Sequence, residues 1–143
     1  MRVSECLHEA PVTVPPECTL EEAARLMGTR GVGSLVVVSG GEVVGIVTDR
    51  DIAVRGVGSG RALTTRVKAV MSENLVTIQG SADIFDAYRL LKDAGVRRLP
   101  VLEDGDLGGI ITVDDLLVAL VLELGAVVSP IVKEVLDPEL PSR

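Results

Sequence analysis

The sequence contains an internal repeat with an offset of 64 residues, and no other feature constrains the fold as strongly. Residues 12–52 align with residues 76–116 without a gap. Many aligned positions are identical, among them the pairs Ala23 and Ala87, Gly31 and Gly95, Gly45 and Gly109, Thr48 and Thr112, and Asp51 and Asp115. Chance would not preserve this spacing, so we expect two tandem copies of one structural unit.

Each copy is predicted to run strand, helix, strand, turn, strand, helix. In the first copy, Thr19 and Glu22 have the spacing of a capping box, which starts a helix. The apolar positions that follow at helical spacing are Leu20, Ala23, Ala24 and Met27. Gly31 suits the left-handed residue that ends such a helix.

A β-hairpin is predicted after this helix in each copy. The apolar strand segments are residues 35–38 and 43–47, joined by Ser39-Gly40-Gly41, and residues 99–102 and 107–111, joined by Asp104-Gly105. Their continuous apolar character indicates burial on both faces. The sequence therefore predicts an α/β (α+β) fold of two tandem βαββα units.

The boundaries of the units are predicted from glycine, proline and apolar patterns. Residues 1–64 hold the first unit, with a lead-in at 3–7 and a flexible linker at 56–60, and residues 65–125 hold the second, with a short lead-in helix at 65–71. Residues 126–143 form a C-terminal extension, which Gly125 and Pro130 are expected to punctuate. Its apolar positions, Ile131, Val132, Val135 and Leu136, either cover a dimer surface or pack on the chain's own second unit.

Composition disfavours binding of nucleic acid. The formal net charge of −7 repels phosphates, and the only aromatic residues, Phe85 and Tyr88, lie in one predicted helix. With 47% hydrophobic residues and a mean hydropathy of +0.41, the chain has enough apolar material for a core. That core, and any ligand cleft, must be mainly aliphatic.

The apolar segments favour a cytoplasmic protein without a membrane partner. The start of the chain lacks the apolar region of a secretory signal. The longest apolar run, 116–122, lies between Asp115 and Glu123 and is far shorter than the ~20 residues that span a bilayer, so we expect a buried helix there.

The two cysteines are expected to be structural. Cys6 and Cys18 lack the close spacing of a zinc or redox motif, and the cytosol would keep both reduced. Together with His8, the lone histidine, they could converge on a metal, but the fourth ligand is missing. We therefore predict no metal site.

The most informative residues stand where a strand leads into a helix. Thr48 and Asp51 in the first copy recur as Thr112 and Asp115. A helix N-terminus offers free N–H groups to a phosphate, the threonine can add a donor, and the carboxylate can accept from both ribose hydroxyls. The glycine three residues before each threonine could let a flat ligand approach the strand. The competing interpretation is a capping box that serves only the helix, and both roles can coexist.

An enzyme is not predicted. The sequence has no Ser-His-Asp or Cys-His set at a recognisable spacing and no Gly-x-x-x-x-Gly-Lys loop. Binding without turnover is the simpler interpretation.

These features together resemble a tandem pair of cystathionine-β-synthase-type (CBS) domains, also called a Bateman module. The resemblance rests on the repeat, the Thr-x-x-Asp junctions, Val-Arg-Arg-Leu-Pro-Val at 96–101 and Val-Thr-Asp-Arg-Asp-Ile at 47–52, and it extends from about Val3 to about Leu124. It implies pseudo-twofold symmetry, with the two sheets packed together and two related clefts. Each cleft would take an adenosine-containing ligand such as AMP, ADP, ATP, S-adenosylmethionine or an NAD-type molecule.

The resemblance also implies roles for particular residues. Asp51 and Asp115 would hold ribose, and Thr48 and Thr112 would meet ribose or phosphate. The aliphatic adenine slots would be lined by Val14, Ile46, Ile78 and Ile110, with Thr13 and Thr77 nearby.

The two copies differ near one cleft. Arg97 and Arg98 of the second copy correspond to Gly33 and Ser34 of the first. Because arginine suits phosphate oxygens, the cleft near Arg98 is predicted to take a phosphorylated ligand, unless both arginines are solvated or pair with acids.

The lead-ins differ as well, since Met71-Ser72 of the second copy corresponds to Leu7-His8 of the first. The family's usual lead-in is Met-Ser or Met-Thr, so the first lead-in's contribution to a cleft is in doubt. His8 is expected on a surface or an interface rather than in ligand binding.

The resulting functional hypothesis is a small bacterial regulatory protein that senses an adenosyl ligand, needs no cofactor, forms a homodimer and acts on a target protein. The alternatives are a scaffold dimer without a ligand and a regulator that acts on nucleic acid.

Overall fold

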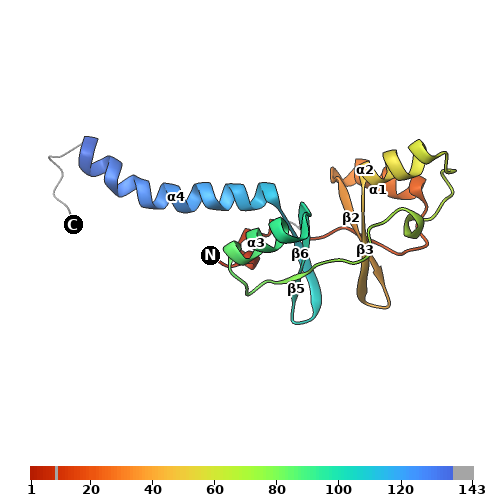
Figure 1. The fold of residues 1–143 in the computed structure, drawn as a ribbon, viewed down its shortest axis with the longest axis horizontal. Helices are drawn as coiled ribbons and strands as arrows, with labels where there is room; N and C mark the ends of the chain where they lie inside the picture. The colour runs from red at the N-terminus through yellow and green to blue at the C-terminus, as the bar shows by residue number, and fades with distance from the viewer. Residues whose placement is uncertain (9, 137–143) are drawn as a thin grey trace.

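The computed structural model describes residues 1–8 and 10–136 and has two similar halves that stand side by side (Figure 1). The first half contains β1 (Thr13–Val14), α1 (Leu20–Arg30), β2 (Ser34–Ser39), β3 (Glu42–Thr48) and α2 (Asp49–Asp51). The second contains β4 (Ile78–Gln79), α3 (Ile84–Ala94), β5 (Arg98–Glu103), β6 (Asp106–Thr112) and α4 (Val113–Leu136). The prediction of an α/β fold with two tandem βαββα units is confirmed.

The two halves have the same sheet topology. Each is a three-stranded sheet in which a short first strand pairs in parallel with the second strand, and the second pairs antiparallel with the third. The hairpin turns use two successive residues with positive φ, at 58° and 79° for Gly40 and Gly41 and at 51° and 88° for Asp104 and Gly105. This is the backbone that two-residue hairpins favour.

Local signals place the first helix of each half. Thr19 accepts a hydrogen bond from the Glu22 amide, and Glu22 accepts one from the Thr19 amide, so the predicted capping box forms. Asp83 caps α3 by accepting from the Phe85 amide. Gly31 and Gly95 end the two helices with φ of 65° each.

The lead-in segments are exchanged between the halves. The short 3-10 helix η1 (Val3–Cys6) packs on the core of the second half, whereas η4 (Val67–Ala69) packs on the core of the first. Backbone hydrogen bonds repeat this pattern: the Val3 amide donates to Ala82, and the Val67 amide donates to Cys18. The lead-in expected within the first unit thus completes the core of the second. The boundaries at 1–64, 65–125 and 126–143 stay a prediction.

The repeated glycines of the third strands serve this exchange. A Cβ on Gly45 would lie 2.5 Å from Met71 Sδ and 3.0 Å from the Ser72 carbonyl oxygen. A Cβ on Gly109 would lie 2.9 Å from Leu7 Cδ1. We had expected these glycines to admit a flat ligand, but in both halves they admit the lead-in of the other half.

The halves diverge after the third strand. In the first half, α2 continues into a π-helix, η2 (Ile52–Gly56), and a 3-10 helix, η3 (Val57–Ser59). The prediction of a flexible linker at 56–60 was therefore wrong for most of this segment, because Gly56 is buried in the helical turn against Leu20. Glycine marks close packing here rather than flexibility.

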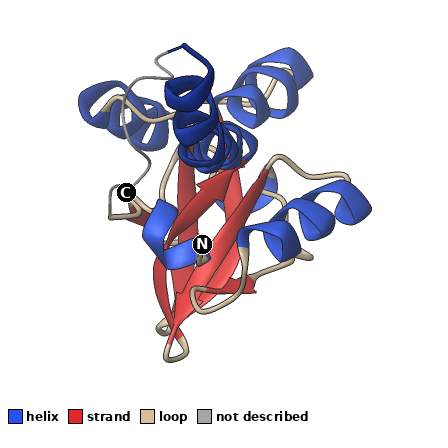
Figure 2. Ribbon diagram, turned by 90° about the vertical axis from the view of Figure 1, so that its left-hand side faces the viewer, coloured by secondary structure: helices blue, strands red, loops and turns tan. Residues whose placement is uncertain are grey.

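In the second half, α4 runs without a break from Val113 to Leu136 (Figure 1). The expected punctuation at Gly125 and Pro130 was wrong, because glycine can adopt helical φ and ψ, and a proline removes only one backbone hydrogen bond of a long helix. The expected extension is thus part of the last helix of the fold. Figure 2, which looks along α4, shows this helix above the strands.

Helix α4 is only partly covered by the rest of the chain. Leu116 and Ala119 are each 4% exposed, but Leu117, Val121 and Leu122 are about 60% exposed. The expectation that residues 116–122 form a buried helix was therefore wrong, because a single sheet and helix can cover only one side of α4. Packing of Ile131, Val132 and Val135 on the chain's own second unit is excluded in the same way, since these three side chains are exposed. The side chain of Leu136 lies outside the described part.

By length and composition, α4 from Val113 to Val135 could cross a membrane, since it contains an 18-residue stretch with a mean hydropathy of 2.1. One helix of this kind is weak evidence for a span. The cytoplasmic location and the absence of a membrane partner stay predictions.

Candidate functional site

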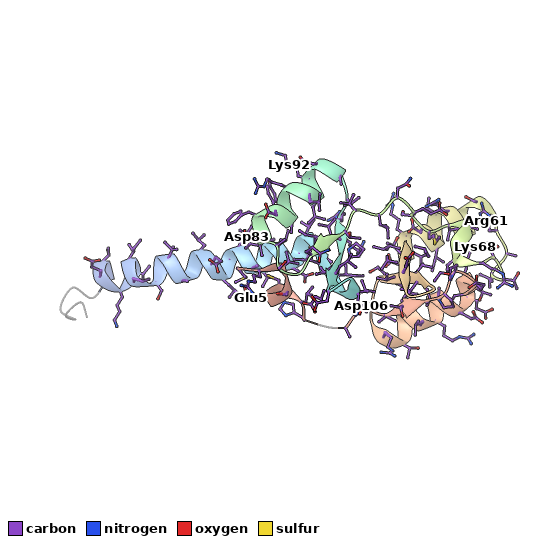
Figure 3. The ribbon with its side chains drawn as sticks, turned by 90° about the horizontal axis from the view of Figure 1, so that it is seen from below. Glu5, Arg61, Lys68, Asp83, Lys92 and Asp106 are labelled. Atoms are coloured by element: carbon purple, nitrogen blue, oxygen red, sulfur yellow. The ribbon has the colours of Figure 1, made fainter. Side chains whose placement is uncertain are left out.

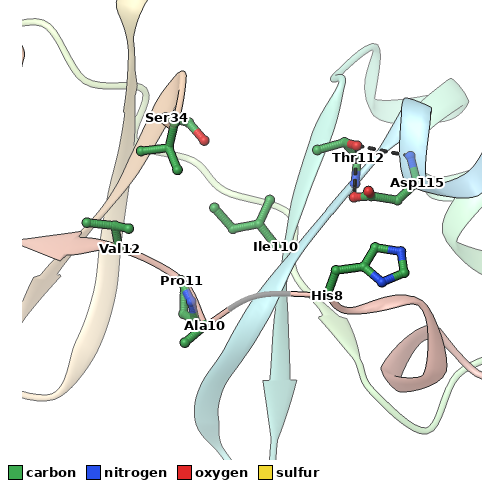
Figure 4. Close-up of a pocket in the computed structure, with 9 residues that line it drawn as sticks. His8, Ala10, Pro11, Val12, Ser34, Ile110, Thr112 and Asp115 are labelled. Carbon is green, nitrogen blue, oxygen red and sulfur yellow. Dashed lines mark hydrogen bonds between the residues drawn. The ribbon is translucent and has the colours of Figure 1, made fainter. Parts of the chain in front are cut away.

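A cleft of about 230 Å³ lies between the two halves. Its walls come from both: residues before and at the start of β2 face residues at the end of β6 and the start of α4 (Figure 4). The lining residues are His8, Ala10, Pro11, Val12, Val32, Ser34, Ile110, Thr112 and Asp115. The cleft is mainly aliphatic with a few polar groups, most of them on the side of the second half (Figure 4), and this composition is typical of small-molecule sites.

The polar side of the cleft is the junction of β6 and α4. The Asp115 amide donates to Thr112 Oγ1 at 3.1 Å, and Asp115 Oδ2 accepts from both the Thr112 amide and its hydroxyl at 2.8 Å (Figure 4). These bonds fix the carboxylate against the helix N-terminus. Among the described residues, Asp115 Oδ1 has no hydrogen-bond partner, so this oxygen is available to a ligand hydroxyl.

The junction of β3 and α2 repeats the geometry with one difference. Thr48 Oγ1 accepts from the Asp51 amide at 3.1 Å, and Asp51 Oδ2 accepts from the Thr48 amide at 2.9 Å. Here Asp51 Oδ1 lies 3.9 Å from Arg55 Nη1. The residue that corresponds to Arg55 in the second half is the buried Ala119, which cannot form such a pair.

Both interpretations of the Thr-x-x-Asp motif are thus compatible with the structure. The capping boxes form in both halves, as the structural interpretation predicted. Each uses a single oxygen of the carboxylate, so a capping role does not consume the aspartate. At Thr112 and Asp115 the same corner also lines a cleft.

The charge at this cleft is set by few groups. Among the described residues that line it, there is no lysine or arginine, and Asp115 is the one carboxylate. The N-terminus of the 24-residue helix α4 contributes partial positive charge at the same corner. The described residues of the cleft therefore offer an acceptor for hydroxyl groups and the partial positive charge of a helix N-terminus, without a lysine or an arginine.

Four of the predicted site residues come together at this cleft: Ser34, Ile110, Thr112 and Asp115. The others lie elsewhere. Val14 and Ile78 are buried in the two cores, while Thr13 and Thr77 are exposed. Gly33 accepts a hydrogen bond from the Asp49 amide and Ile46 pairs with Ser72, so both support the junctions. The role of each as a ligand contact stays a prediction.

The two arginines differ in exposure. Arg97 is exposed, and Arg98, the first residue of β5, is half-buried opposite Thr112 in the strand register. Neither arginine lines the cleft, whereas Ser34, the residue of the first half that corresponds to Arg98, does line it. Neither forms an ion pair within the described part of the chain.

Sequence reasoning missed five residues that line the cleft: His8, Ala10, Pro11, Val12 and Val32. His8 was expected on a surface or interface and is exposed, yet it lines the cleft. The signal that could have found it is its position after Leu7: once the lead-in packs on the second half, the next residues must pass between the halves.

This passage differs between the two halves. Ser72 and Ile46 exchange two backbone hydrogen bonds, at 3.0 and 2.9 Å, which attach the lead-in of the second half to the edge of β3. Among the described residues, the corresponding pair of His8 and Ile110 forms no such bonds. Ile46 is 6% exposed as a result, whereas Ile110 is half-buried and faces the cleft.

The two cysteines lie in different cores, Cys6 in that of the second half and Cys18 in that of the first. Burial raises the pKa of the Cys6 thiol, and nearby Glu5 adds to this effect. Burial also raises the pKa of Cys18, with a further contribution from Glu22. Both thiols are thus held in their protonated, unreactive form.

Comparisons with known proteins agree with this geometry. The family model of the CBS domain matches twice, at residues 3–57 and 67–122. The CBS domain-containing protein YhcV of Bacillus subtilis is 39% identical over 116 residues, which are 81% of this chain and 83% of that protein. The CBS domain protein PAE2072 of Pyrobaculum aerophilum, solved in complex with AMP, superimposes with a TM-score of 0.77 at 26% identity and covers 88% of this chain and 99% of that one.

A third relative is an enzyme that contains a similar region. Inosine-5'-monophosphate dehydrogenase of Bifidobacterium longum is 43% identical over 108 residues, which are 73% of this chain but only 19% of the dehydrogenase. The similarity therefore concerns a small part of that enzyme.

Proposed function

The chain belongs to the CBS-domain family, with two domains in tandem, and from this premise we propose that it is a regulatory protein that binds an adenosine-containing ligand in the cleft between its halves. The observation that carries the proposal is the corner of Thr112 and Asp115, which is rigidly capped, lines the cleft and keeps one carboxylate oxygen free of protein partners. That the similar AMP-bound protein has the same fold supports the ligand class.

The proposed binding mode follows from the lining of the cleft. Asp115 Oδ1 accepts hydrogen bonds from the ribose hydroxyls, and Thr112 with the α4 N-terminus meets the 5′ substituent. The base lies among Val12, Val32 and Ile110, whose side chains come from both halves. A ligand held in this way contacts both halves at once and stabilises their mutual arrangement.

The 5′ substituent distinguishes the two related corners. The described residues that line the cleft at Asp115 include no lysine or arginine, which favours a nucleoside with little negative charge, such as S-adenosylmethionine or adenosine. The symmetry-related position holds Arg98 in place of Ser34, which favours a phosphorylated ligand such as AMP, ADP or ATP. NAD-type molecules carry two phosphates and belong with the second class.

The remaining features of the proposal concern how such a protein acts. It forms a homodimer in the cytoplasm, requires no cofactor, catalyses no reaction, and changes its affinity for a target protein when the ligand binds. A ligand shifts such an equilibrium only through a difference in affinity between two states.

Isothermal titration calorimetry of the full chain tests the ligand class. Adenosine, S-adenosylmethionine, AMP, ADP, ATP and NAD are titrated separately, with guanosine and GMP as matched controls. At least one adenosyl ligand is expected to bind, and at about 100 times its Kd it should stabilise the fold by about 2.7 kcal/mol in thermal unfolding. If none of the six gives heat or a thermal shift, or if the guanine controls bind equally well, the proposal is wrong.

A further inference from the structure

Helix α4 continues beyond the part of the chain that the family model matches. The match ends at residue 122, but the helix runs on to Leu136. Figures 1 and 3 show this second part of α4 leaving the body of the molecule, and Figure 3 shows the side chains that project from it. The exposed side chains include Leu124, Val127, Ile131 and Val135, each more than half exposed.

The apolar residues of α4 follow a heptad pattern. Val121, Val128 and Val135 lie seven residues apart, and Leu117, Leu124 and Ile131 fill the positions between them at the alternating spacing of four and three. We call these six residues the α4 seam. Such a 3.5-residue repeat is the sequence pattern of helices that pair with one another.

The charges of α4 beyond its first turn lie on the side opposite the seam. With about 100° between successive residues, the seam occupies one stripe, while Glu123, Lys133 and Glu134 fall on the opposite half of the helix together with Ala126 and Pro130. The extension is therefore amphipathic. A helix with one charged side and one uninterrupted apolar side needs an apolar surface to cover it.

The chain's own body cannot supply that surface. Three residues of α4 pack on the core of the second half: Leu116 and Ala119, which are nearly fully buried, and Leu120, which is partly buried. Leu116 and Ala119 lie on the same stripe as Glu123, and Leu120 lies between that stripe and the seam. The body therefore leaves the seam uncovered, and Leu117 is 60% exposed. Leu117 also lines an apolar groove between α3 and α4 with Tyr88 and Leu120, so the apolar surface is continuous from the groove into the seam.

We propose that the α4 seam is the contact surface for the same seam of a second copy of this chain. β-Branched residues at one heptad position and leucine or isoleucine at the other are a combination that pairs helices two by two. Six side chains that each expose roughly 100 Å² would bury about 1,200 Å² over two copies, the lower limit of a specific, stable interface. Val118 and Val132, which flank the seam and are about half exposed, enlarge this area.

A lipid surface fits the seam less well. Membrane-bound amphipathic helices carry lysine and arginine on the polar side, whereas α4 has one lysine and is part of a chain with a net charge of −7. A helix across the bilayer would place Glu123 in the hydrocarbon. The second copy leaves these charges in water.

Sedimentation equilibrium of the full chain and two matched variants tests the proposal. Val128→Asp places a charge in the seam, and Ala126→Asp places the same charge on the opposite stripe two residues away; both positions are exposed. At about 50 μM, the wild type and Ala126→Asp are expected to be dimers. Val128→Asp is expected to be monomeric, with a dimer dissociation constant raised at least 100-fold. Flotation accompanies the measurement. It uses neutral vesicles of phosphatidylcholine and anionic vesicles of phosphatidylcholine mixed with phosphatidylglycerol.

A monomeric wild type, or equal behaviour of the two variants, would overturn the proposal. So would a wild type that floats with vesicles and whose flotation Val128→Asp abolishes, because the lipid would then be the occupant. The test is independent of the ligand: all three proteins should give the same calorimetric Kd for the adenosyl ligand and the same far-UV circular dichroism. A loss of ligand binding in all three would instead count against the proposed function.

Discussion

The junction at Thr48 and Asp51 and the junction at Thr112 and Asp115 have the same sequence pattern and the same capping geometry, yet their surroundings differ. Arg55 lies beside the outer oxygen of Asp51, and Ser72 pairs with the neighbouring edge of β3. At Asp115 the position of Arg55 is taken by Ala119, and the neighbouring Ile110 faces the cleft. Duplication has kept the backbone of the Thr-x-x-Asp corner, while a few side chains change its surroundings. Under the proposed function, these side chains decide which copy is left for a ligand.

The largest effect that this comparison predicts concerns the two aspartates. Asp115→Ala is expected to weaken binding of the adenosyl ligand by roughly 10- to 100-fold, the usual cost of a lost hydrogen bond to a charged group. Asp51→Ala is expected to change the affinity of the cleft at Asp115 for this ligand by less than about threefold. Isothermal titration calorimetry of both variants measures the difference.

Each variant serves as the control for the other. Both lose the hydrogen bond from the threonine amide to the carboxylate, which should cost about 1 kcal/mol of stability in either half. Asp115→Ala also loses the bond from the Thr112 hydroxyl. If Asp51→Ala proved as harmful to binding as Asp115→Ala at equal loss of stability, the two corners would be functionally equivalent, and the comparison would fail.

The glycines of the third strands predict the next largest effect, on stability. Gly45→Ala should lower the free energy of unfolding by about 2–3 kcal/mol, because the new Cβ would meet the Ser72 carbonyl oxygen, a backbone atom that cannot move without loss of the Ile46 pair. Gly109→Ala should cost less, about 1 kcal/mol, because it meets only the end of the Leu7 side chain.

Urea unfolding of the two glycine variants at pH 7 checks this order. A greater loss for Gly109→Ala would show that the first lead-in is held more firmly than the second, the opposite of the difference inferred from the backbone bonds.

The smallest predicted effect separates the two arginines. Arg98→Ser introduces the residue found at the corresponding position of the first half and should weaken AMP about five- to tenfold more than adenosine, because an arginine–phosphate hydrogen bond contributes roughly 1 kcal/mol when half-buried. Arg97→Ser removes the same charge from an exposed position one residue away and should have less than a twofold effect. If the two substitutions had equal effects, Arg98 would act only through its contribution to the net charge of the protein and not through a contact with the phosphate.

Much of the fold could be predicted from the sequence, because local signals and the repeat agree. The capping box at Thr19, the left-handed Gly31 and Gly95 and the two hairpin turns are where their residue types indicate. These features depend on a few neighbouring residues, so a single sequence contains the information that specifies them.

The features that sequence reasoning missed depend on contacts between distant segments. Exchange of the lead-ins assigns a different partner to Gly45 and Gly109 and brings His8 to the cleft, and no local pattern encodes this crossing. Likewise, the apolar run at 116–122 indicated a helix, but its exposure depends on how little of the chain reaches that side of α4. Of the predicted site, the corner at Thr112 and Asp115 could be found because the motif occurs twice.

A methyl NMR titration tests the central claim most directly, because the two halves carry isoleucines at corresponding positions. With isoleucine δ1-methyl labelling, the adenosyl ligand that binds in calorimetry should shift Ile110, which faces the cleft, at a lower concentration than Ile46, whose backbone is paired with Ser72. The methyl group of Ile131, in the α4 seam, should not shift at that concentration. A first response at Ile46, or binding that leaves Ile110 unchanged, would contradict the assignment of the ligand to the cleft at Asp115.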